Sequence, residues 1–157
     1  MAIISKTYSR LLAIIMAWLG FSCEQPDNGG GMICPEYGVP MATYKAKGIV
    51  VSQADNAPIE GIRAVLKAKL DATGERFHGI DTVYTDSKGT FYLKGQNMSS
   101  KMLYVELRDI DGEQNGSFTD MDVVADYSNE KFTGKKDCLY LGEIEKDLEI
   151  IKIKPKE

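Results

Sequence analysis

Apolar and polar residues alternate with a period of two along most of the chain from Tyr44 onward. In Ile62–Leu70 every second residue is apolar, while Arg63, Lys67 and Lys69 occupy positions between them. A period of two is typical of strands with one buried face, and the spacing of an amphipathic helix is scarce. The pattern predicts seven short strands: Tyr44–Val51, Ile62–Leu70, Ile80–Tyr84, Phe91–Leu93, Leu103–Leu107, Val123–Tyr127 and Leu148–Ile153.

Two polar segments between these strands have the composition of tight turns. Ala54–Pro58 (ADNAP) and Asp86–Gly89 (DSKG) place Asp, Asn and Gly where a turn needs local side-chain hydrogen bonds or a positive φ. No segment combines helical spacing with both a start and a stop signal, and parallel βαβ units would need long crossovers. We therefore expect an all-β fold, a seven-stranded antiparallel β-sandwich.

The alternation also assigns side chains to a face of each strand. We expect Phe91 and Val105 inside the sandwich, and Lys67 and Lys69 on the solvent face of the second strand.

The N-terminal residues have a different pattern. Lys6 and Arg10 precede an apolar run from Leu11 to Phe21 that ends at small and polar residues, the layout of a secretory signal peptide. A membrane-spanning helix needs roughly 20 apolar residues, and this run is much shorter. We therefore expect it to be removed.

Leu19–Cys23 resembles a bacterial lipobox, in which a small residue precedes a cysteine that is diacylated and becomes the new first residue. Phe21 departs from that pattern, because a smaller side chain usually stands there. The resemblance implies a lipoprotein signal peptide over 1–22 and lipidation at Cys23, with an ordinary cleaved signal and a retained anchor as alternatives. Glu24 is not the aspartate that commonly signals inner-membrane retention, so we expect an outer-membrane lipoprotein of the cell envelope.

Behind Cys23, Glu24–Met32 contains glycine, proline and short polar residues with nothing to bury, which favours a flexible spacer. We assign 23–33 to a lipidated tether and 34–157 to one β-sandwich domain. Cleavage before Cys23 leaves seventeen cations against twenty-three carboxylates. An acidic surface repels phosphate backbones and anionic lipid alike, so we expect no nucleic-acid partner.

Lys47–Lys67 and Thr82–Gly95 resemble the carboxypeptidase regulatory-like domain, a transthyretin-like seven-stranded sandwich. That family's pattern is a Gly-x-Val strand, a turn closing in Pro and Gly, a second strand, and then Thr-Asp-x-x-Gly-x-Phe. The matching positions are Gly48, Val50, Pro58, Gly61, Val65, Thr85, Asp86, Gly89 and Phe91. The resemblance implies structural roles for all of them.

A second resemblance covers nearly the whole chain and is to the lipoproteins of radical SAM/lipoprotein systems of Gram-negative bacteria. It is carried by CPEYGVPMATYKAKGIV, DTVYTDSKG, RDIDGEQNGSF and LEIIKIKPKE. In that family a Tyr-Gly-x-Pro segment, here Tyr37–Pro40, lies between the lipidated cysteine and the first strand, and the gene lies beside one for a radical SAM enzyme. The resemblance implies a radical SAM enzyme as a candidate partner and no known activity.

His78 is the only histidine, which excludes multi-histidine metal sites. No His-Glu-x-x-His, Cys-x-x-Cys, Walker loop or Gly-x-Ser-x-Gly is present. We interpret His78, in ERFHGID, as a solvated histidine at a loop or strand edge, with a catalytic or ligand role as the alternative. We expect no enzymatic activity, no catalytic residue and no cofactor.

The densest polar cluster is DIDGEQNGSFTDMD. Asp109, Asp111 and Glu113 partly resemble the start of a calcium loop, in which alternate carboxylates bind a hard cation. The twelve-position pattern fails, because Gly112 comes too early and Asp120 stands where the bidentate Glu belongs. A solvated inter-strand loop is the preferred interpretation, and weak calcium binding is the alternative.

Cys34 and Cys138 remain once Cys23 is acylated, and export would place both in an oxidising compartment. A bridge between them would close a loop of about a hundred residues, worth roughly 4–5 kcal/mol in the chain-entropy treatment. The alternative is that Cys34 stays reduced, either exposed or as a modification target.

Two function classes remain open. The first is a noncatalytic, membrane-anchored lipoprotein whose β-sandwich is a binding or structural module. The second is a substrate of a neighbouring radical SAM enzyme, modified in Cys34–Pro40, where Cys34 and Tyr37 are the candidate modification or recognition residues. In the first class, Pro35 and Pro40 only stiffen the lead-in to the sandwich.

Overall fold

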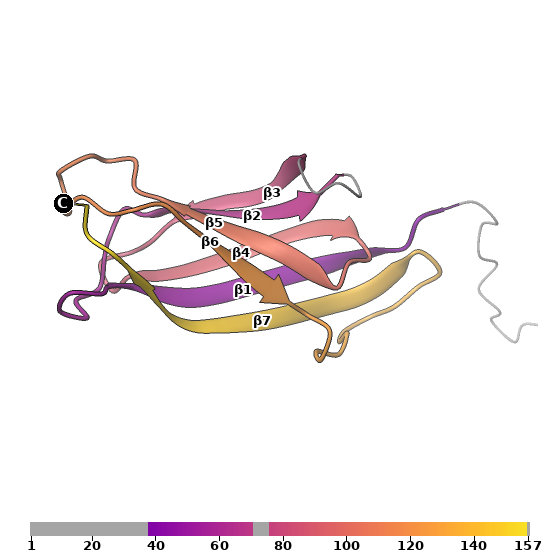
Figure 1. The fold of residues 1–157 in the computed structure, drawn as a ribbon. Coiled ribbons are helices and arrows are strands. Elements are labelled where there is room, and N and C mark those ends of the chain that lie inside the picture. Colours follow the sequence, from indigo (N-terminus) through magenta and orange to yellow (C-terminus); the bar gives the residue numbers. More distant parts are fainter. Residues whose placement is uncertain (1–37, 71–75, 157) are drawn as a thin grey trace, which may run out of the picture. The chain divides into compact units, whose positions relative to one another are not determined.

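The computed structural model describes residues 38–70 and 76–156. They belong to one compact unit that runs from Cys34 to Glu157. The described residues contain seven strands and no helix: β1 (Met41–Ser52), β2 (Arg63–Lys69), β3 (Phe77–Tyr84), β4 (Thr90–Met98), β5 (Met102–Arg108), β6 (Met121–Asp126) and β7 (Tyr140–Ile153). They form two sheets, with strand orders β4-β1-β7 and β3-β2-β5-β6 (Figure 1). The predicted all-β class is confirmed.

Each alternating segment of the sequence falls on one strand, and β7 differs most from its predicted range. It begins at Tyr140, eight residues before the predicted start at Leu148. The more buried positions in this first half include Gly142, Ile144 and Lys146, of which only Ile144 is a large apolar residue. The apolar alternation is therefore too weak there to indicate a strand.

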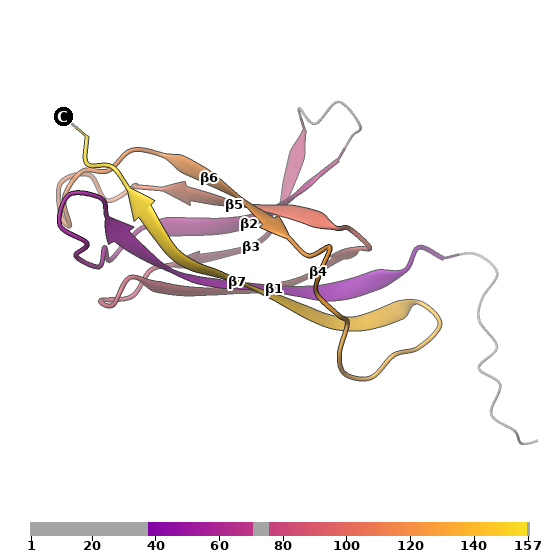
Figure 2. The same cartoon turned by 60° about the horizontal axis from the view of Figure 1, so that its bottom comes forward.

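One strand pair corrects the expectation of a wholly antiparallel fold. β1 and β7 pair in parallel, from Met41 opposite Tyr140 to Ser52 opposite Ile153, whereas the other pairs are antiparallel. Figure 2 shows β7 beside β1 from a second side. Residues 53–139, which include the other five strands, connect β1 to β7. The parallel pair therefore needs no βαβ unit, and no local sequence pattern indicates it.

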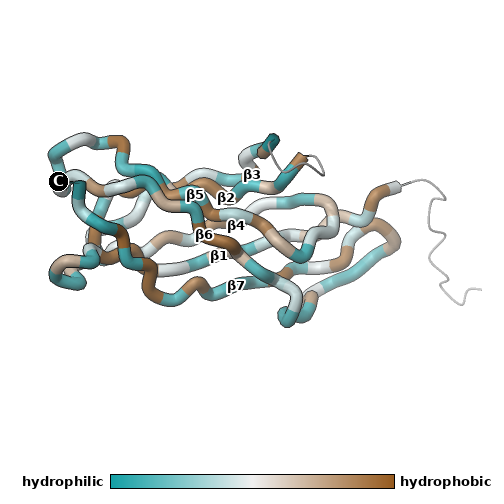
Figure 3. Tube along the Cα trace, in the orientation of Figure 1, coloured by the Kyte–Doolittle hydropathy of each residue, from teal (hydrophilic) through white to brown (hydrophobic). Residues whose placement is uncertain are grey.

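The core lies between the inner faces of the two sheets, and the hydropathy alternates along their strands (Figure 3). Phe91 from β4 and Val105 from β5 are 2% and 0% exposed, which confirms both predictions. On β2, Lys67 and Lys69 lie on the outer face as expected, but only Lys69 is exposed. Lys67 is half-buried because it forms an ion pair with Glu106 of β5.

Both predicted turns are present. In the first, Asn56 has a φ of 58° and the Asp55 carboxylate accepts a hydrogen bond from the Ala57 amide. In the second, Gly89 has a φ of 71°, and a Cβ there would lie 2.3 Å from the Val50 carbonyl oxygen. Glycine is therefore required at position 89, both for its conformation and for the close approach of β1.

The strands end at two tips. The proximal tip, where the chain enters β1, consists of 38–40, residues 70 and 76, 99–101, 127–139 and the adjoining strand ends. Pairing places these ends together within each sheet, since Met41 lies opposite both Met98 and Tyr140, and Lys69 lies opposite Phe77. One hollow lined by Met98 and Lys69 joins the two sheets at this tip. The distal tip consists of 53–62, 85–89, 109–120 and 154–156.

Candidate functional site

The described part of the predicted modification segment is Gly38–Pro40, at the proximal tip. The Pro40 carbonyl accepts a 3.0 Å hydrogen bond from the Ser99 amide, and the Met41 amide donates to the Leu139 carbonyl at 2.8 Å. A Cβ on Gly38 would lie 2.6 Å from Leu139 Cδ2. The lead-in to β1 is therefore held between the β4–β5 turn and the start of β7.

A carboxylate organises the turn on the β7 side of this lead-in. Asp137 Oδ1 accepts hydrogen bonds from the amides of Leu139 (2.9 Å) and Tyr140 (2.8 Å). The Tyr140 hydroxyl and Thr43 Oγ1 of β1 lie 2.7 Å apart in a hydrogen bond. These contacts fix the neighbours of Cys138 to the first strand.

Cys138 is disulfide-bonded. The chain has three cysteines, and the other two, Cys23 and Cys34, lie outside the described residues, as does Tyr37. The pairing of Cys138 with Cys34, the lipidation of Cys23 and the modification of Cys34 or Tyr37 stay predictions.

A hollow of about 340 Å³ lies beside the lead-in. It is lined by both sheets and by the β4–β5 turn: Ala68, Lys69, Asn97–Met102 and Tyr104. The Lys69 ammonium stands 4.9 Å from the centre of the Tyr104 ring, and Phe77 meets that ring edge-to-face at 5.3 Å. The side of the hollow formed by β2 and β5 thus combines a cation with an aromatic ring.

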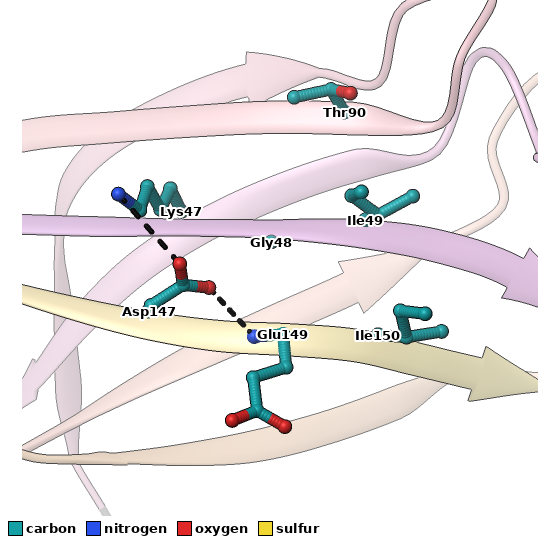
Figure 4. A pocket seen from close by; sticks show the side chains of 7 residues that line it. All are labelled: Lys47, Gly48, Ile49, Thr90, Asp147, Glu149 and Ile150. Atoms are coloured by element: carbon teal, nitrogen blue, oxygen red, sulfur yellow. Dashed lines mark hydrogen bonds and ion pairs between the residues drawn. The ribbon is translucent and has the colours of Figure 1, made fainter.

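A second hollow, of about 320 Å³, lies on the outer face of the three-stranded sheet (Figure 4). It arises at a β-bulge, since Lys47 pairs with Asp147 and Ile49 with Ile150, which leaves two residues of β7 opposite Gly48. A Cβ on Gly48 would lie 3.0 Å from the Phe91 ring, so the glycine lets that ring pack beneath the bulge.

Two polar side chains of this bulge hollow, Lys47 and Asp147, are paired. Lys47 Nζ lies 2.8 Å from Glu145 and 3.6 Å from Asp147, whose carboxylate also accepts the Glu149 amide at 2.9 Å. The hydrogen bond to Glu145 raises the pKa of Lys47 above its usual range. Lys47 therefore stays protonated and cannot serve as a nucleophile or general base at neutral pH, although it can bind a polar ligand.

The structure corrects the interpretation of His78 in part. The residue lies within β3, the edge strand of the four-stranded sheet, and is half-buried rather than on a solvated loop. A bulge at Ile80 lets β3 continue past Gly79, so the glycine does not end the strand. Nδ1 of His78 is buried and has no hydrogen-bond partner.

The calcium candidates lie on the irregular connection between β5 and β6, as the loop interpretation expects. Asp109 accepts the Phe118 amide and Asp111 accepts the Asn115 side-chain amide, each at 2.7 Å. Glu113 is exposed. Among residues 38–70 and 76–156, no group of three or more His, Cys, Asp or Glu could hold a metal ion. The three carboxylates are therefore not brought together as a metal site.

Sequence reasoning missed both hollows. No local pattern in the sequence indicates the bulge, because a glycine at position 48 is equally compatible with a regular strand that packs closely against its neighbour. The sequence gives a weak indication of the hollow at the proximal tip, since two large apolar residues, Met98 and Met102, flank a short polar turn.

No family model and no curated protein matches the sequence. Solved structures with a similar fold include 3-chlorocatechol 1,2-dioxygenase from Rhodococcus opacus, at 10% identity over 80% of this chain and 64% of that one, with a TM-score of 0.45. Hydroxyquinol 1,2-dioxygenase from Pseudomonas putida matches at 9% identity over 91% and 71%, also with a TM-score of 0.45. The pilus 2b backbone protein of group B streptococcus matches at 11% identity over 71% and 40%, with a TM-score of 0.40.

This chain thus spans 64% of the chlorocatechol dioxygenase and 40% of the pilus protein. At these TM-scores the likenesses carry no conclusion about activity. No family model supports either resemblance, to the carboxypeptidase regulatory-like domain or to radical SAM-associated lipoproteins. Both remain expectations. Within 38–70 and 76–156, no helix is long and apolar enough to cross a membrane.

Proposed function

We propose that this protein is a noncatalytic lipoprotein of the cell envelope, anchored in the outer membrane through acylated Cys23. Its β-sandwich, of the transthyretin-like type, is a binding or structural module. The observation that carries the proposal is the disulfide bond of Cys138, since disulfides persist in oxidising compartments outside the cytoplasm. The signal-like apolar run before Cys23 supports the same destination.

The charged groups of the bulge hollow support a module without catalysis. In the bulge hollow, Lys47 is held in its charged form by Glu145, and Asp147 is occupied by Lys47 and by a backbone amide. Such groups offer hydrogen bonds and charge to a ligand, whereas nucleophilic catalysis needs an activated group beside its base.

Membrane fractionation with palmitate labelling tests the proposal. Cys23→Ala removes the acylated thiol, and we expect it to lose both the label and the membrane association. Ser22→Ala is the matched control, because it keeps a small residue before the cysteine and should keep the label. A labelled, membrane-bound Cys23→Ala variant would contradict lipidation at this residue.

The second candidate function is that of a substrate for a radical SAM enzyme, modified in Cys34–Pro40. It is supported by the exposure of the described end of this segment, since Gly38, Val39 and Pro40 are all exposed. Peptide mapping and intact-mass measurement of the protein made with and without a neighbouring radical SAM gene test it. A mass difference confined to this segment supports modification, and identical masses overturn it.

A further inference from the structure

We propose that the hollow at the proximal tip binds a short extended peptide segment with an apolar side chain. The Asn97 carboxamide pairs with the N–H and C=O of one ligand residue, and Met98 and Met102 contact the side chain of that residue. The inference rests on the proposed function, because it names the class of ligand for a β-sandwich that acts as a binding module.

Asn97 is a polar residue at an inward position of β4. Phe91 and Leu93 point into the core from this strand, and Asn97 continues the same alternation opposite the fully buried Ala42. Asn97 is 7% exposed, yet its side-chain amide forms no hydrogen bond with any described residue. The amide nitrogen and oxygen remain open to solvent, and the residue lines the hollow.

Such an amide is unfavourable for the core alone. An inward polar group without a protein partner stabilises the fold less than an apolar side chain of the same size would. The presence of Asn97 at this position is therefore better explained by a ligand in the hollow than by the packing of the two sheets.

The β4–β5 turn, which forms one wall of the hollow, is held in place without a ligand. The buried Tyr44 hydroxyl accepts a hydrogen bond from the Ser100 amide at 2.6 Å and donates one to the Ser100 carbonyl at 2.9 Å. Ser100 Oγ donates to the Met102 carbonyl at 2.9 Å. The Ser99 amide donates to the Pro40 carbonyl at 3.0 Å. A wall fixed in this way loses little conformational freedom when a ligand binds.

A carboxamide matches the backbone of an extended peptide. In a strand, the N–H and C=O of one residue point to the same side and exchange two hydrogen bonds with a partner. The Asn97 amide offers a donor nitrogen and an acceptor oxygen to such a residue. Met98 and Met102, 49% and 52% exposed, line the same hollow and offer adaptable apolar surface to the side chain. Both kinds of contact are uncharged, so the net charge of the tip does not decide the binding.

The size and lining of the hollow favour a peptide segment over a sugar. A volume of about 340 Å³ lies at the small end of the usual range of ligand pockets, about 300–1,000 Å³, and suits one residue with its flanking peptide groups. A sugar site typically has an open aromatic face on which the ring stacks. Among the described residues that line the hollow, only Tyr104 is aromatic, and the Lys69 ammonium covers one face of its ring.

Nuclear magnetic resonance of the acylated mature protein in detergent micelles tests the inference, because the side-chain amide of Asn97 gives its own signals. The probe is N-acetyl-leucine N′-methylamide, which is one residue flanked by two peptide groups. The comparison probes are its alanine counterpart, an analogue with an ester oxygen in place of the leucine N–H, and methyl β-glucoside. Asn97→Leu removes the amide at similar volume, and Gln96→Leu, at an exposed position of β4, is the matched control.

We expect the leucine probe to shift the Asn97 side-chain signals in a saturable manner, with a dissociation constant in the millimolar range that suits so small a ligand. In the variants, the backbone amides of 99–102 report the binding. Asn97→Leu should weaken it about tenfold because two hydrogen bonds are lost, and Gln96→Leu should leave it unchanged.

Two comparisons on the wild-type protein do not depend on the folding of a variant. The ester analogue should bind several-fold more weakly than the leucine probe, because it lacks the N–H donor. The alanine probe should also bind several-fold more weakly, because it lacks most of the apolar side chain.

Equal binding of the leucine probe and its ester analogue overturns the recognition of a peptide group by Asn97. Equal binding of the leucine and alanine probes overturns the contact with the methionines. A glucoside that shifts the Asn97 signals at lower concentration than the leucine probe overturns the peptide in favour of a sugar. Signals that do not shift with the leucine probe up to its solubility limit overturn the site altogether.

The mass of the protein in the same sample separates this inference from the proposed function. A protein without acyl groups contradicts the lipid anchor, and its binding measurements stay valid because the hollow lies within the folded domain. An acylated protein whose Asn97 signals do not respond contradicts only the peptide site.

Discussion

The Met41 amide donates a 2.8 Å hydrogen bond to the carbonyl oxygen of Leu139, the residue that follows the disulfide-bonded Cys138. The first residue of β1 is thereby joined to the residue before β7 at the point where the two strands begin their parallel pairing. The start of β1, near the N-terminal end of the described domain, is consequently fixed to the start of β7, the last strand in the sequence. The proximal tip is therefore the end of the domain at which the chain enters β1.

The disulfide of Cys138 gives the first prediction. We expect Cys34 as its partner, so that Cys34→Ser and Cys138→Ser each lower the free energy of unfolding by about 2–4 kcal/mol in denaturant titration of exported protein. The double variant should lose no more than either single one, because both remove the same bridge. Non-reducing peptide mapping identifies the partner directly. Recovery of Cys34 as a free thiol would contradict the pairing.

Thr85 supports a second prediction. Its buried hydroxyl donates to the Ile59 carbonyl at 2.7 Å and accepts from the Ile62 amide at 2.9 Å. Thr85→Val leaves both backbone groups unpaired and should lower the free energy of unfolding by about 1–3 kcal/mol. Thr82→Val is the control on the exposed side of β3 and should change it little. Equal effects of the two substitutions would show that the buried hydroxyl has no special role.

Phe91 and Tyr92 are neighbours on β4 with opposite orientations, at 2% and 46% exposure. Phe91→Ala should lower the free energy of unfolding by about 3–5 kcal/mol, because it removes a buried ring and leaves a cavity. Tyr92→Ala should cost less than about 1 kcal/mol, as is usual for surface positions. Urea titration of both variants checks the assignment, which fails if Tyr92→Ala is the more costly.

Because of Tyr127, we expect the free energy of unfolding to change with pH in the alkaline range. Burial raises the pKa of its phenol above the usual value of 10, so the folded protein holds this proton more tightly than the unfolded chain. The resulting stabilisation is fully present below pH 10 and is lost as the pH rises above 10 toward the folded-state pKa. Tyr127→Phe lacks the ionising group, although it also loses a 3.0 Å hydrogen bond to the Lys45 carbonyl.

The variant should therefore be less stable than the wild type at pH 7, and the difference should shrink between pH 10 and pH 11. Thermal unfolding across this range measures it. A difference that stays constant up to pH 11 would exclude a linked ionisation of Tyr127.

The strands were predictable because one face of each is buried in a shared core. Alternation in Ile62–Leu70 and Leu103–Leu107 reports that burial directly, and Gly89 marks a turn whose conformation favours glycine. The parallel pairing of β1 with β7 was not predictable, because period two is the same in parallel and antiparallel strands with one buried face. The first half of β7 was missed because Gly142 and Lys146 interrupt its apolar alternation.

The candidate sites were less predictable than the strands, because they depend on which strand ends meet. Sequence proximity left weak calcium binding at Asp109, Asp111 and Glu113 as the alternative to a solvated loop. The fold uses the first two carboxylates in hydrogen bonds within the β5–β6 connection. Met98 and Lys69 come from different sheets, and only the packing of these sheets brings them to one hollow.

Intact-mass spectrometry of the protein purified from the cell envelope tests the central claim, lipid anchoring at Cys23, most directly. The account predicts a polypeptide that begins at Cys23 and carries the mass of two or three acyl chains, located on the N-terminal cysteine by peptide fragmentation. A polypeptide that starts elsewhere, or one whose Cys23 carries no acyl group, would contradict it.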